Sequence, residues 1–295
     1  MNKKLELYID LLKDINNIPA PTDGETKLLE YLKDLCNIKN IPFQTVGTGL
    51  FNNIPSLLTG KESNHILVIH SDRVSENRNL TIEKENLIGK LDNSLSLSVC
   101  LQQILNDPLN FNLSILITTS EEGPDKHGNF DHGGRGFCDY LTDILTKLGI
   151  DEISKKYFYC IDTRPLNDYD YYEDVNGEKK SFNEILGLVI RTSERNMLFV
   201  NSQLKKLIID IANENNIPIF YFPYNNEFGS GITELGRGWG KVLSKEMINS
   251  ENYKISWIQI PVLNNHSINE STRISNIIYL FELLEKLNKK IINIS

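Results

Sequence analysis

Three short apolar runs in the sequence each lead into side chains that could hold a metal ion. These side chains belong to His70, to the neighbouring pair Glu121 and Glu122, and to Asp162. Continuous apolar runs of this length are typical of strands that are buried on both faces of a sheet. In open α/β sheets, ligands bind outside the carboxyl ends of the strands, so we expect these groups to meet at one edge of a sheet.

Two further candidate ligands lie outside those three runs. Asp92 stands just before a helical pattern, and His266 follows a strand that is expected to end at Val262. Imidazole and carboxylate groups are ligands that zinc accepts. A single catalytic zinc site normally uses three protein ligands and a water molecule, so five candidates are too many for one ion. They would suit two neighbouring ions if one carboxylate bridges both.

Each candidate also has a non-catalytic interpretation. The His70–Asp72 stretch could be a turn, Asp92 could be the N-cap of the helix that follows it, and Asp162 could belong to a turn. A Glu-Glu pair in a loop is usually solvated surface. The metal site is favoured by the joint pattern of chain order, placement at strand ends and suitable ligand types.

The elements that must position these residues alternate along the chain. Apolar spacing predicts helices over residues 3–17, 94–105, 137–148, 201–213 (capped by Asn201–Ser202) and 271–287, and one from a T-x-x-E capping box at Thr22–Glu25 to Leu35. Apolar runs predict strands over residues 66–69, 113–117, 157–161, 217–221 and 256–262. Strands that alternate with helices indicate an α/β fold.

We expect one catalytic domain over residues 1–295, because no repeat, low-complexity tract or clear linker divides the chain. A chain of this length can bury a sizeable core. Residues 167–180 are polar, rich in Tyr and Asp, and contain an Asn-Gly turn signal, which predicts a hairpin or flap on that domain.

The bulk composition narrows the class of protein. The net charge is −8 and no long run of Lys and Arg occurs, so we expect no nucleic-acid partner. No apolar run approaches the length that spans a bilayer, and the charged N-terminus lacks the apolar core of a signal peptide, so we expect no membrane partner. The four cysteines lie far apart, which argues against a thiolate zinc cluster and a disulfide framework. We therefore expect a cytoplasmic protein.

The chain order His-x-Asp, Asp, Glu-Glu, Asp, His resembles that of the co-catalytic zinc exopeptidases, a group of aminopeptidases, carboxypeptidases, dipeptidases and amino-acid deacylases. The similarity covers most of the chain. It is carried by the segments IPAPTDGE (18–25), GKLDN (89–93), TTSEEG (118–123), GRG (134–136) and residues 261–270. The resemblance implies a three-layer α/β/α fold around a central sheet that is mixed and mostly parallel.

The resemblance also implies two bound metal ions and a role for each of the five ligands. His70 and Asp162 would bind one ion, Glu122 and His266 would bind the other, and Asp92 would bridge them. Zinc is expected from the ligand types, and cobalt or manganese would fit similar ligands.

Two further acidic residues complete the implied site. Asp72 would accept a hydrogen bond from the His70 ring and so fix the orientation of that ring. Glu121 would be the general base that takes a proton from the water between the ions and passes it to the leaving amine. Bound metal ions lower the pKa of such a water molecule and polarise the carbonyl that is attacked.

The chain departs from the family pattern in its spacing. The steps from His70 to Asp92 and from Asp162 to His266 leave no room for the inserted domains of the larger members. The sequence therefore indicates a bare catalytic domain with a short flap.

Two loops carry further candidates. An insertion after the Glu-Glu pair contains His127 and His132, which could contact substrate or replace a ligand, or could lie in a solvated loop. A later Gly-rich loop offers Thr233 for substrate binding and Arg237 for a substrate carboxylate. A flexible structural loop would explain the same composition.

The sequence predicts a zinc-dependent hydrolase, namely an aminopeptidase or dipeptidase that cleaves small peptides. A second interpretation is an amidohydrolase that removes the acyl group from an N-acyl amino acid, because the same metal chemistry serves any amide. A third is a non-catalytic relative that kept the fold and the metal ligands. The substrate would be a small peptide or an acyl amino acid, and the oligomeric state stays open, a homo-oligomer included.

Overall fold

The apolar runs of the sequence form strands, and amphipathic segments form the helices that cover them. The computed structural model describes residues 3–73, 80–122, 134–166, 172–181, 184–191, 193–194, 198–199, 201–222, 242, 254–267 and 269–291. The helices are α1 (Lys3–Asn17), α2 (Thr26–Ile38), α3 (Ser94–Asn106), α4 (Arg135–Leu148), α5 (Ile150–Ser154), α6 (Ser202–Glu214) and α9 (Ile274–Ile291). The strands are β1 (Phe43–Val46), β2 (Ser56–Thr59), β3 (His65–His70), β4 (Thr81–Glu83), β5 (Asn86–Gly89), β6 (Ser114–Thr118), β7 (Tyr157–Pro165), β8 (Tyr172–Glu173), β9 (Lys179–Lys180), β10 (Leu188–Arg191), β11 (Ser193–Glu194), β12 (Leu198–Phe199), β13 (Ile219–Phe222), β14 (Lys254–Val262) and β15 (Glu270–Arg273).

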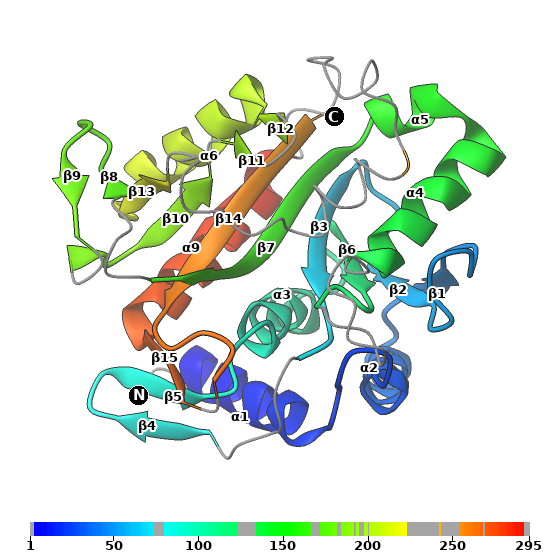
Figure 1. The fold of residues 1–295 in the computed structure, drawn as a ribbon, viewed down its shortest axis with the longest axis horizontal. Coiled ribbons are helices and arrows are strands. Elements are labelled where there is room, and N and C mark those ends of the chain that lie inside the picture. The colour runs from blue at the N-terminus through cyan, green and yellow to red at the C-terminus, as the bar shows by residue number, and fades with distance from the viewer. Residues whose placement is uncertain are drawn as a thin grey trace.

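Ten of these strands form the main sheet, in the order β1-β2-β6-β3-β7-β14-β10-β13-β8-β9 (Figure 1). The four central strands β6, β3, β7 and β14 are parallel to one another. Strands β10 and β13 are parallel to each other but run antiparallel to β14. The sheet is therefore mixed with a parallel centre, and the carboxyl ends of its central strands meet at one edge.

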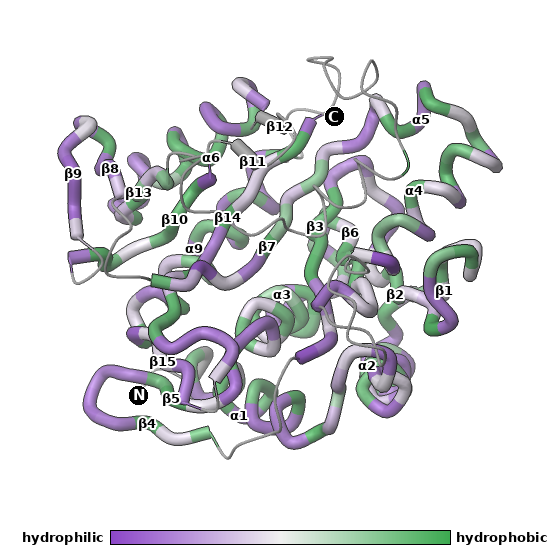
Figure 2. The backbone as a smooth tube through the Cα atoms, in the orientation of Figure 1, coloured by the Kyte–Doolittle hydropathy of each residue, from purple (hydrophilic) through white to green (hydrophobic). Residues whose placement is uncertain are grey.

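Alternate residues of the central strands face different layers of helices. On β3, Leu67 and Ile69 join a core with residues of α1, α2, α3, α6 and α9, whereas Ile66 and Val68 pack with residues of α4 and α5. Figure 1 shows these two groups of helices on opposite sides of the sheet. Figure 2 shows hydrophobic residues along much of β3 and α3 and hydrophilic residues on β9. The three-layer α/β/α architecture is thus confirmed.

A smaller antiparallel sheet, β15-β5-β4, lies next to α1 in Figure 1. Its strand β5 ends shortly before Asp92, and its strand β15 begins shortly after His266. Pairing of β15 with β5 therefore brings together two candidate ligands that are far apart in the sequence. It also corrects one prediction: the last helix begins at Ile274 rather than at Ser271, because the backbone before Ile274 pairs with β5.

The predicted capping box at Thr22–Glu25 is wrong. Helix α2 begins at Thr26, and no side chain caps its first turn. The hydroxyl of Thr22 instead donates to Asp72, and the carboxylate of Glu25 accepts from the backbone N–H of Ser120. Both side chains are thus engaged by distant parts of the chain, at the edge where the candidate ligands lie.

The N-termini of α6 and α3 bear on two further predictions about helix caps. Asn201 caps α6 as predicted, since its Oδ1 accepts from the backbone N–H groups of Gln203 (3.1 Å) and Leu204 (3.2 Å). Helix α3 has Asn93 at its N-cap position. The carboxylate of Asp92 is therefore not the helix cap.

The described part of the segment at 167–180 is a hairpin. Strands β8 and β9 are antiparallel, and β8 pairs with β13, so the hairpin extends the main sheet at its edge. The carboxylate of Asp174 accepts the backbone N–H groups of Asn176 and Glu178 in the connecting turn. Residues 167–171 lie outside the described residues.

The four cysteines are buried free thiols. Among the helices of the described ranges, none combines the length and the apolar character that crossing a membrane requires.

Candidate functional site

His70 and Asp162 come together because their strands are neighbours in the sheet. Strands β3 and β7 pair in parallel up to Val68 and Cys160, so the next residues on the same face are His70 and Asp162. The Nε2 atom of His70 lies 3.4 Å from Oδ1 of Asp162. His70 is the last residue of β3 and is buried, at 2% exposure, so it does not belong to a turn.

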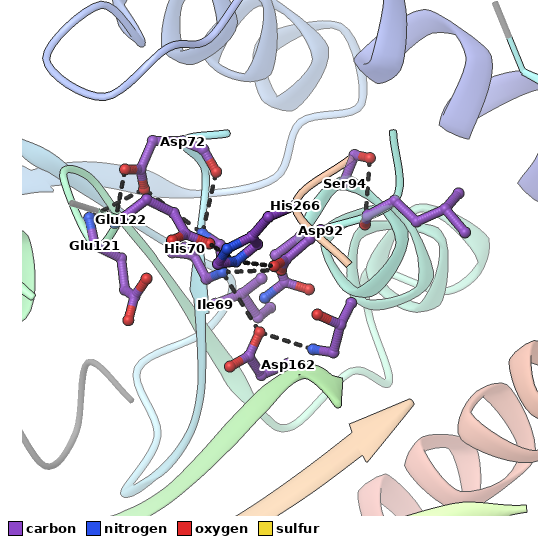
Figure 3. Close-up of polar contacts among 12 residues, drawn as sticks. Ile69, His70, Asp72, Asp92, Ser94, Glu121, Glu122, Asp162 and His266 are labelled. Atoms are coloured by element: carbon purple, nitrogen blue, oxygen red, sulfur yellow. Dashed lines mark hydrogen bonds and ion pairs between the residues drawn. The ribbon is translucent and has the colours of Figure 1, made fainter. Parts of the chain in front are cut away.

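The carboxylate of Asp92 contacts two imidazole rings, which lie next to it in Figure 3. Its Oδ1 is 3.4 Å from Nε2 of His70, and its Oδ2 is 3.2 Å from Nε2 of His266. The same Nε2 atom of His266 also lies 3.3 Å from Oε1 of Glu122. The structure thus brings together all five residues that the sequence proposed as ligands, with Asp92 at the centre and one of its oxygens directed to each ring.

The pair Glu121 and Glu122 is not solvated surface. Both side chains are buried, at 6% and 8% exposure. A ligand atom of Glu122, one of His70 and one of Asp92 all lie within 4.8 Å of one another, a spacing that could hold a metal ion. In Figure 3 the side chain of Glu121 extends from the Asp72 side of this group toward the side on which Asp162 lies.

Asp72 holds the loop of the Glu-Glu pair. Its carboxylate accepts the backbone N–H groups of Glu121 (3.0 Å) and Glu122 (2.9 Å) and the hydroxyl of Thr22 (2.8 Å). The Nδ1 atom of His70 lies 3.1 Å from the main-chain carbonyl oxygen of Asp72 and 3.5 Å from its carboxylate. The hydrogen bond to the ring therefore runs to the backbone of Asp72, and it leaves Nε2 of His70 directed into the group of carboxylates.

The charges of the group are strongly coupled. Burial disfavours the charged form of His70, but Asp162, Asp72 and Asp92 together hold its pKa well above the usual 6.5. Hydrogen bonding with Asp92 and Glu122 raises the pKa of His266 to about 11. The carboxylates thus create a strongly negative environment that attracts positive charge.

Asp92 and Glu122 respond to this environment in opposite directions. Burial acts to raise the pKa of Asp92, yet the two imidazoles hold it well below its usual range. Burial and the charge of Asp92 raise the pKa of Glu122. The pattern identifies Asp92 as the carboxylate that both rings stabilise.

Three buried charged residues that the sequence analysis did not include among the site residues lie next to the site. They are Glu25, Lys90 and Glu270. Burial and the nearby Asp72 raise the pKa of Glu25 to about 8. The carboxylate of Glu270 accepts hydrogen bonds from Lys90 and from the backbone N–H of Asp92. All three lie within the segments that carry the family resemblance, which was the signal available in the sequence.

The remaining candidates from the sequence are His127, His132, Thr233 and Arg237. They lie outside the described residues. Their proposed contacts with substrate stay predictions.

No protein-family model and no curated protein sequence matches the chain. Several solved structures match it over nearly the whole length of both chains. A TET aminopeptidase from a marine-sediment Thaumarchaeota archaeon superposes with a TM-score of 0.66 at 13% identity, covering 96% of this chain and 96% of that one. An aminopeptidase from the archaeon Desulfurococcus kamchatkensis gives 0.64 at 15% identity, with 96% and 94% covered.

A third match comes from a bacterium. The aminopeptidase PepT from Bacillus cereus superposes with a TM-score of 0.61 at 9% identity, covering 95% of this chain and 96% of that one. At such identities the likeness concerns the fold. The chain has the fold of these aminopeptidases, which confirms at the level of fold the resemblance to the co-catalytic zinc exopeptidases.

Proposed function

We propose that this protein is a metal-dependent hydrolase that cleaves the peptide bond of small peptides, as an aminopeptidase or a dipeptidase. One observation carries the proposal: Asp92 directs one oxygen to His70 and the other to His266. Asp162 contacts the same Nε2 atom of His70 as Asp92 does, and Glu122 contacts the same Nε2 atom of His266. This is the arrangement expected where two cations share one carboxylate.

The residues fit a metal centre chemically. Oδ1 of Asp92 is buried and receives no hydrogen bond from the described part of the chain. A buried carboxylate oxygen without a hydrogen bond is costly unless a cation compensates it. Imidazole nitrogens and carboxylate oxygens are ligands of zinc, and cobalt or manganese would fit a similar set.

We assign His70, Asp92 and Asp162 to one ion and Asp92, Glu122 and His266 to the other. When bound, such ions would acidify a water molecule and polarise an amide carbonyl. Asp72 would keep His70 in the tautomer that presents Nε2, through the hydrogen bond at Nδ1.

Glu121 is the proposed general base. It is buried, it is adjacent to Glu122 in the chain, and Figure 3 shows its side chain beside the group of proposed ligands. It would take a proton from the attacking water and deliver it to the leaving amine.

The likeness in fold to solved aminopeptidases favours a peptide substrate. The metal chemistry alone would serve the amide of an N-acyl amino acid as well. The test is a panel of aminoacyl anilides, dipeptides and N-acyl amino acids, assayed with metal-stripped protein and after reconstitution with zinc. We expect aminoacyl anilides and dipeptides to be hydrolysed only after zinc has been restored. Turnover confined to acyl amino acids would make the protein a deacylase, and turnover without metal would refute the proposal.

We further propose a homo-oligomer. Two solved structures with this fold are described as a dodecamer and as a tetrahedral or octahedral assembly. Light scattering coupled to size-exclusion chromatography should give a mass above the 33.8 kDa of one chain. A mass equal to one chain would contradict this.

A further inference from the structure

Glu270, the first residue of β15, is completely buried and receives four hydrogen bonds on its carboxylate. Lys90 Nζ (2.9 Å) and the backbone N–H of His266 (2.7 Å) donate to Oε1. The backbone N–H of Asp92 (2.9 Å) and that of Leu91 donate to Oε2. One carboxylate therefore joins the chain around Asp92 to the chain around His266.

The proposed ligands are supported in two different ways. His70 lies on β3 and pairs with Thr118 of β6, and Asp162 lies on β7 and pairs with Gln259 of β14, so the main sheet fixes both backbones. Asp92 and His266 lie in loops outside the strands. The backbone of His266 has a φ of +60°, a conformation that residues other than Gly adopt infrequently. These two loop ligands need an additional contact to hold them in place.

The pair Lys90–Glu270 has the properties of such a contact. Both side chains are 0% exposed. A buried ion pair often stabilises a fold no more than apolar residues of similar size would, because both charges must leave water. Three of the four hydrogen bonds to Glu270 come from backbone N–H groups at or next to a proposed ligand. The pair is therefore placed to orient ligands rather than to stabilise the core alone.

We propose that Glu270 is a positioning residue for one half of the metal centre. It holds Asp92 and His266 so that they converge with Glu122, while the main sheet holds His70 and Asp162 without it. This role rests on the proposed function. It predicts that loss of Glu270 weakens the ion assigned to Asp92, Glu122 and His266, two of whose ligands Glu270 holds, more than the ion assigned to His70, Asp92 and Asp162, of which it holds one.

The test is calorimetric titration of the full-length, metal-stripped chain with Zn²⁺ and, separately, with Co²⁺, whose absorption spectrum reports the ligand environment. Wild type should bind two ions. The variant Glu270→Gln keeps the size of the side chain but removes its charge. In this variant the ion assigned to Asp92, Glu122 and His266 should bind about 10–100-fold more weakly, the usual effect of losing a residue that orients a ligand. The ion assigned to His70, Asp92 and Asp162 should lose less affinity, because two of its three ligands lie on the main sheet. Glu214→Gln is the matched control, because Glu214 pairs with Lys290 on the surface.

Glu270→Asp is the second variant, in case Glu270→Gln does not fold by circular dichroism. It keeps the charge opposite Lys90 but is one methylene shorter. We therefore expect a smaller selective loss of affinity for the ion assigned to Asp92, Glu122 and His266. Unchanged affinity for both ions, equal weakening of both, or unfolding of both variants would overturn the positioning role. If the wild type binds two ions but hydrolyses no amide, the proposed hydrolase function is refuted. The titration of the Glu270 variants would then still decide the positioning role. Wild type that binds fewer than two ions would overturn the two-ion centre and this role with it.

Discussion

At the residue scale, the neighbouring acids Glu121 and Glu122 have different surroundings although they are adjacent in the chain. The carboxylate of Glu122 lies 3.3 Å from the His266 ring, and burial raises its pKa. The backbone N–H groups of both residues are held by Asp72. One loop thus presents a proposed ligand and a proposed base side by side, and their roles can be separated by substitution.

The variant Glu121→Gln should keep both metal ions but lose about 10²–10⁴-fold in kcat, the usual contribution of a general base. The reason is that Gln keeps the shape of the side chain and cannot take up the proton. Metal content by mass spectrometry and kcat on an aminoacyl anilide are the measurements. Glu178→Gln, on the exposed β8–β9 turn, is the control. An unchanged kcat would show that Glu121 is not the base.

His65 makes the stability depend on pH at the opposite end of β3. Its ring stacks on Tyr157 with centroids 4.2 Å apart, and its Nδ1 lies 3.0 Å from the hydroxyl of Tyr159. Burial and the nearby Lys254 lower its pKa to about 4. Because the unfolded chain binds this proton near pH 6.5 and the folded chain does not, stability falls as the pH falls from about 6.5 to about 4.

Between pH 7 and pH 5, this group should lower the free energy of unfolding by about 2 kcal/mol. The variant His65→Phe keeps the stacking and has no proton to bind, so its stability should fall less over the same interval. Urea unfolding at both pH values, with metal-stripped protein of each kind, measures the difference. Equal losses in wild type and variant would contradict the assignment.

At the element scale, the segment between α1 and α2 (residues 18–25) supports the loop that carries Glu121 and Glu122. Thr22 donates to Asp72, and Glu25 accepts from Ser120. These contacts explain why a segment with the spacing of a capping box does not cap its helix. The same side chains satisfy polar groups of a buried loop, where an unmade hydrogen bond would cost more than an uncapped helix end.

The variant Thr22→Val should lower the free energy of unfolding by about 1 kcal/mol, because one acceptor site of the buried Asp72 is left without its hydroxyl donor. It should also reduce kcat, since Asp72 positions Glu121 and Glu122. Thr142→Val on α4, which loses only a bond to the backbone carbonyl of Cys138, is the control. The idea fails if both variants behave alike in urea unfolding and in turnover.

At the scale of the whole molecule, the proposed metal centre joins separate parts of the fold. Its ligands come from β3, from β7, from the loop after β6, and from the two loops that adjoin the small sheet. Ions that bind all of these parts bind only the folded chain. The proposed centre should therefore couple metal binding to global stability.

Zinc should raise the melting temperature of the metal-stripped protein by several degrees. Each ion present at 100 times its Kd adds about 2.7 kcal/mol to the folded state. Differential scanning calorimetry before and after chelation, and again after zinc is restored, measures the shift. A melting temperature that does not respond to zinc would mean that no such centre forms in the folded protein.

Much of the fold could be predicted from local patterns. The central strands that deliver His70 and Asp162 are marked by continuous apolar runs, and the helix that follows Asn201 is marked by its cap. Such signals are local, because burial and capping act over a few residues. The local pattern does not predict that the last helix begins at Ile274, because the residues before it pair with β5, a distant segment of the chain.

The sequence places imidazoles and carboxylates at the ends of apolar runs, and this local pattern predicts that they gather at one edge of a sheet. How their side chains meet depends on contacts between distant segments. Thr22 and Glu25 find partners 50 and 95 positions away, and Glu270 contacts Asp92 across 178 positions. No local pattern encodes such partners, because each polar group, once buried, bonds with whatever the packing of distant elements brings within reach.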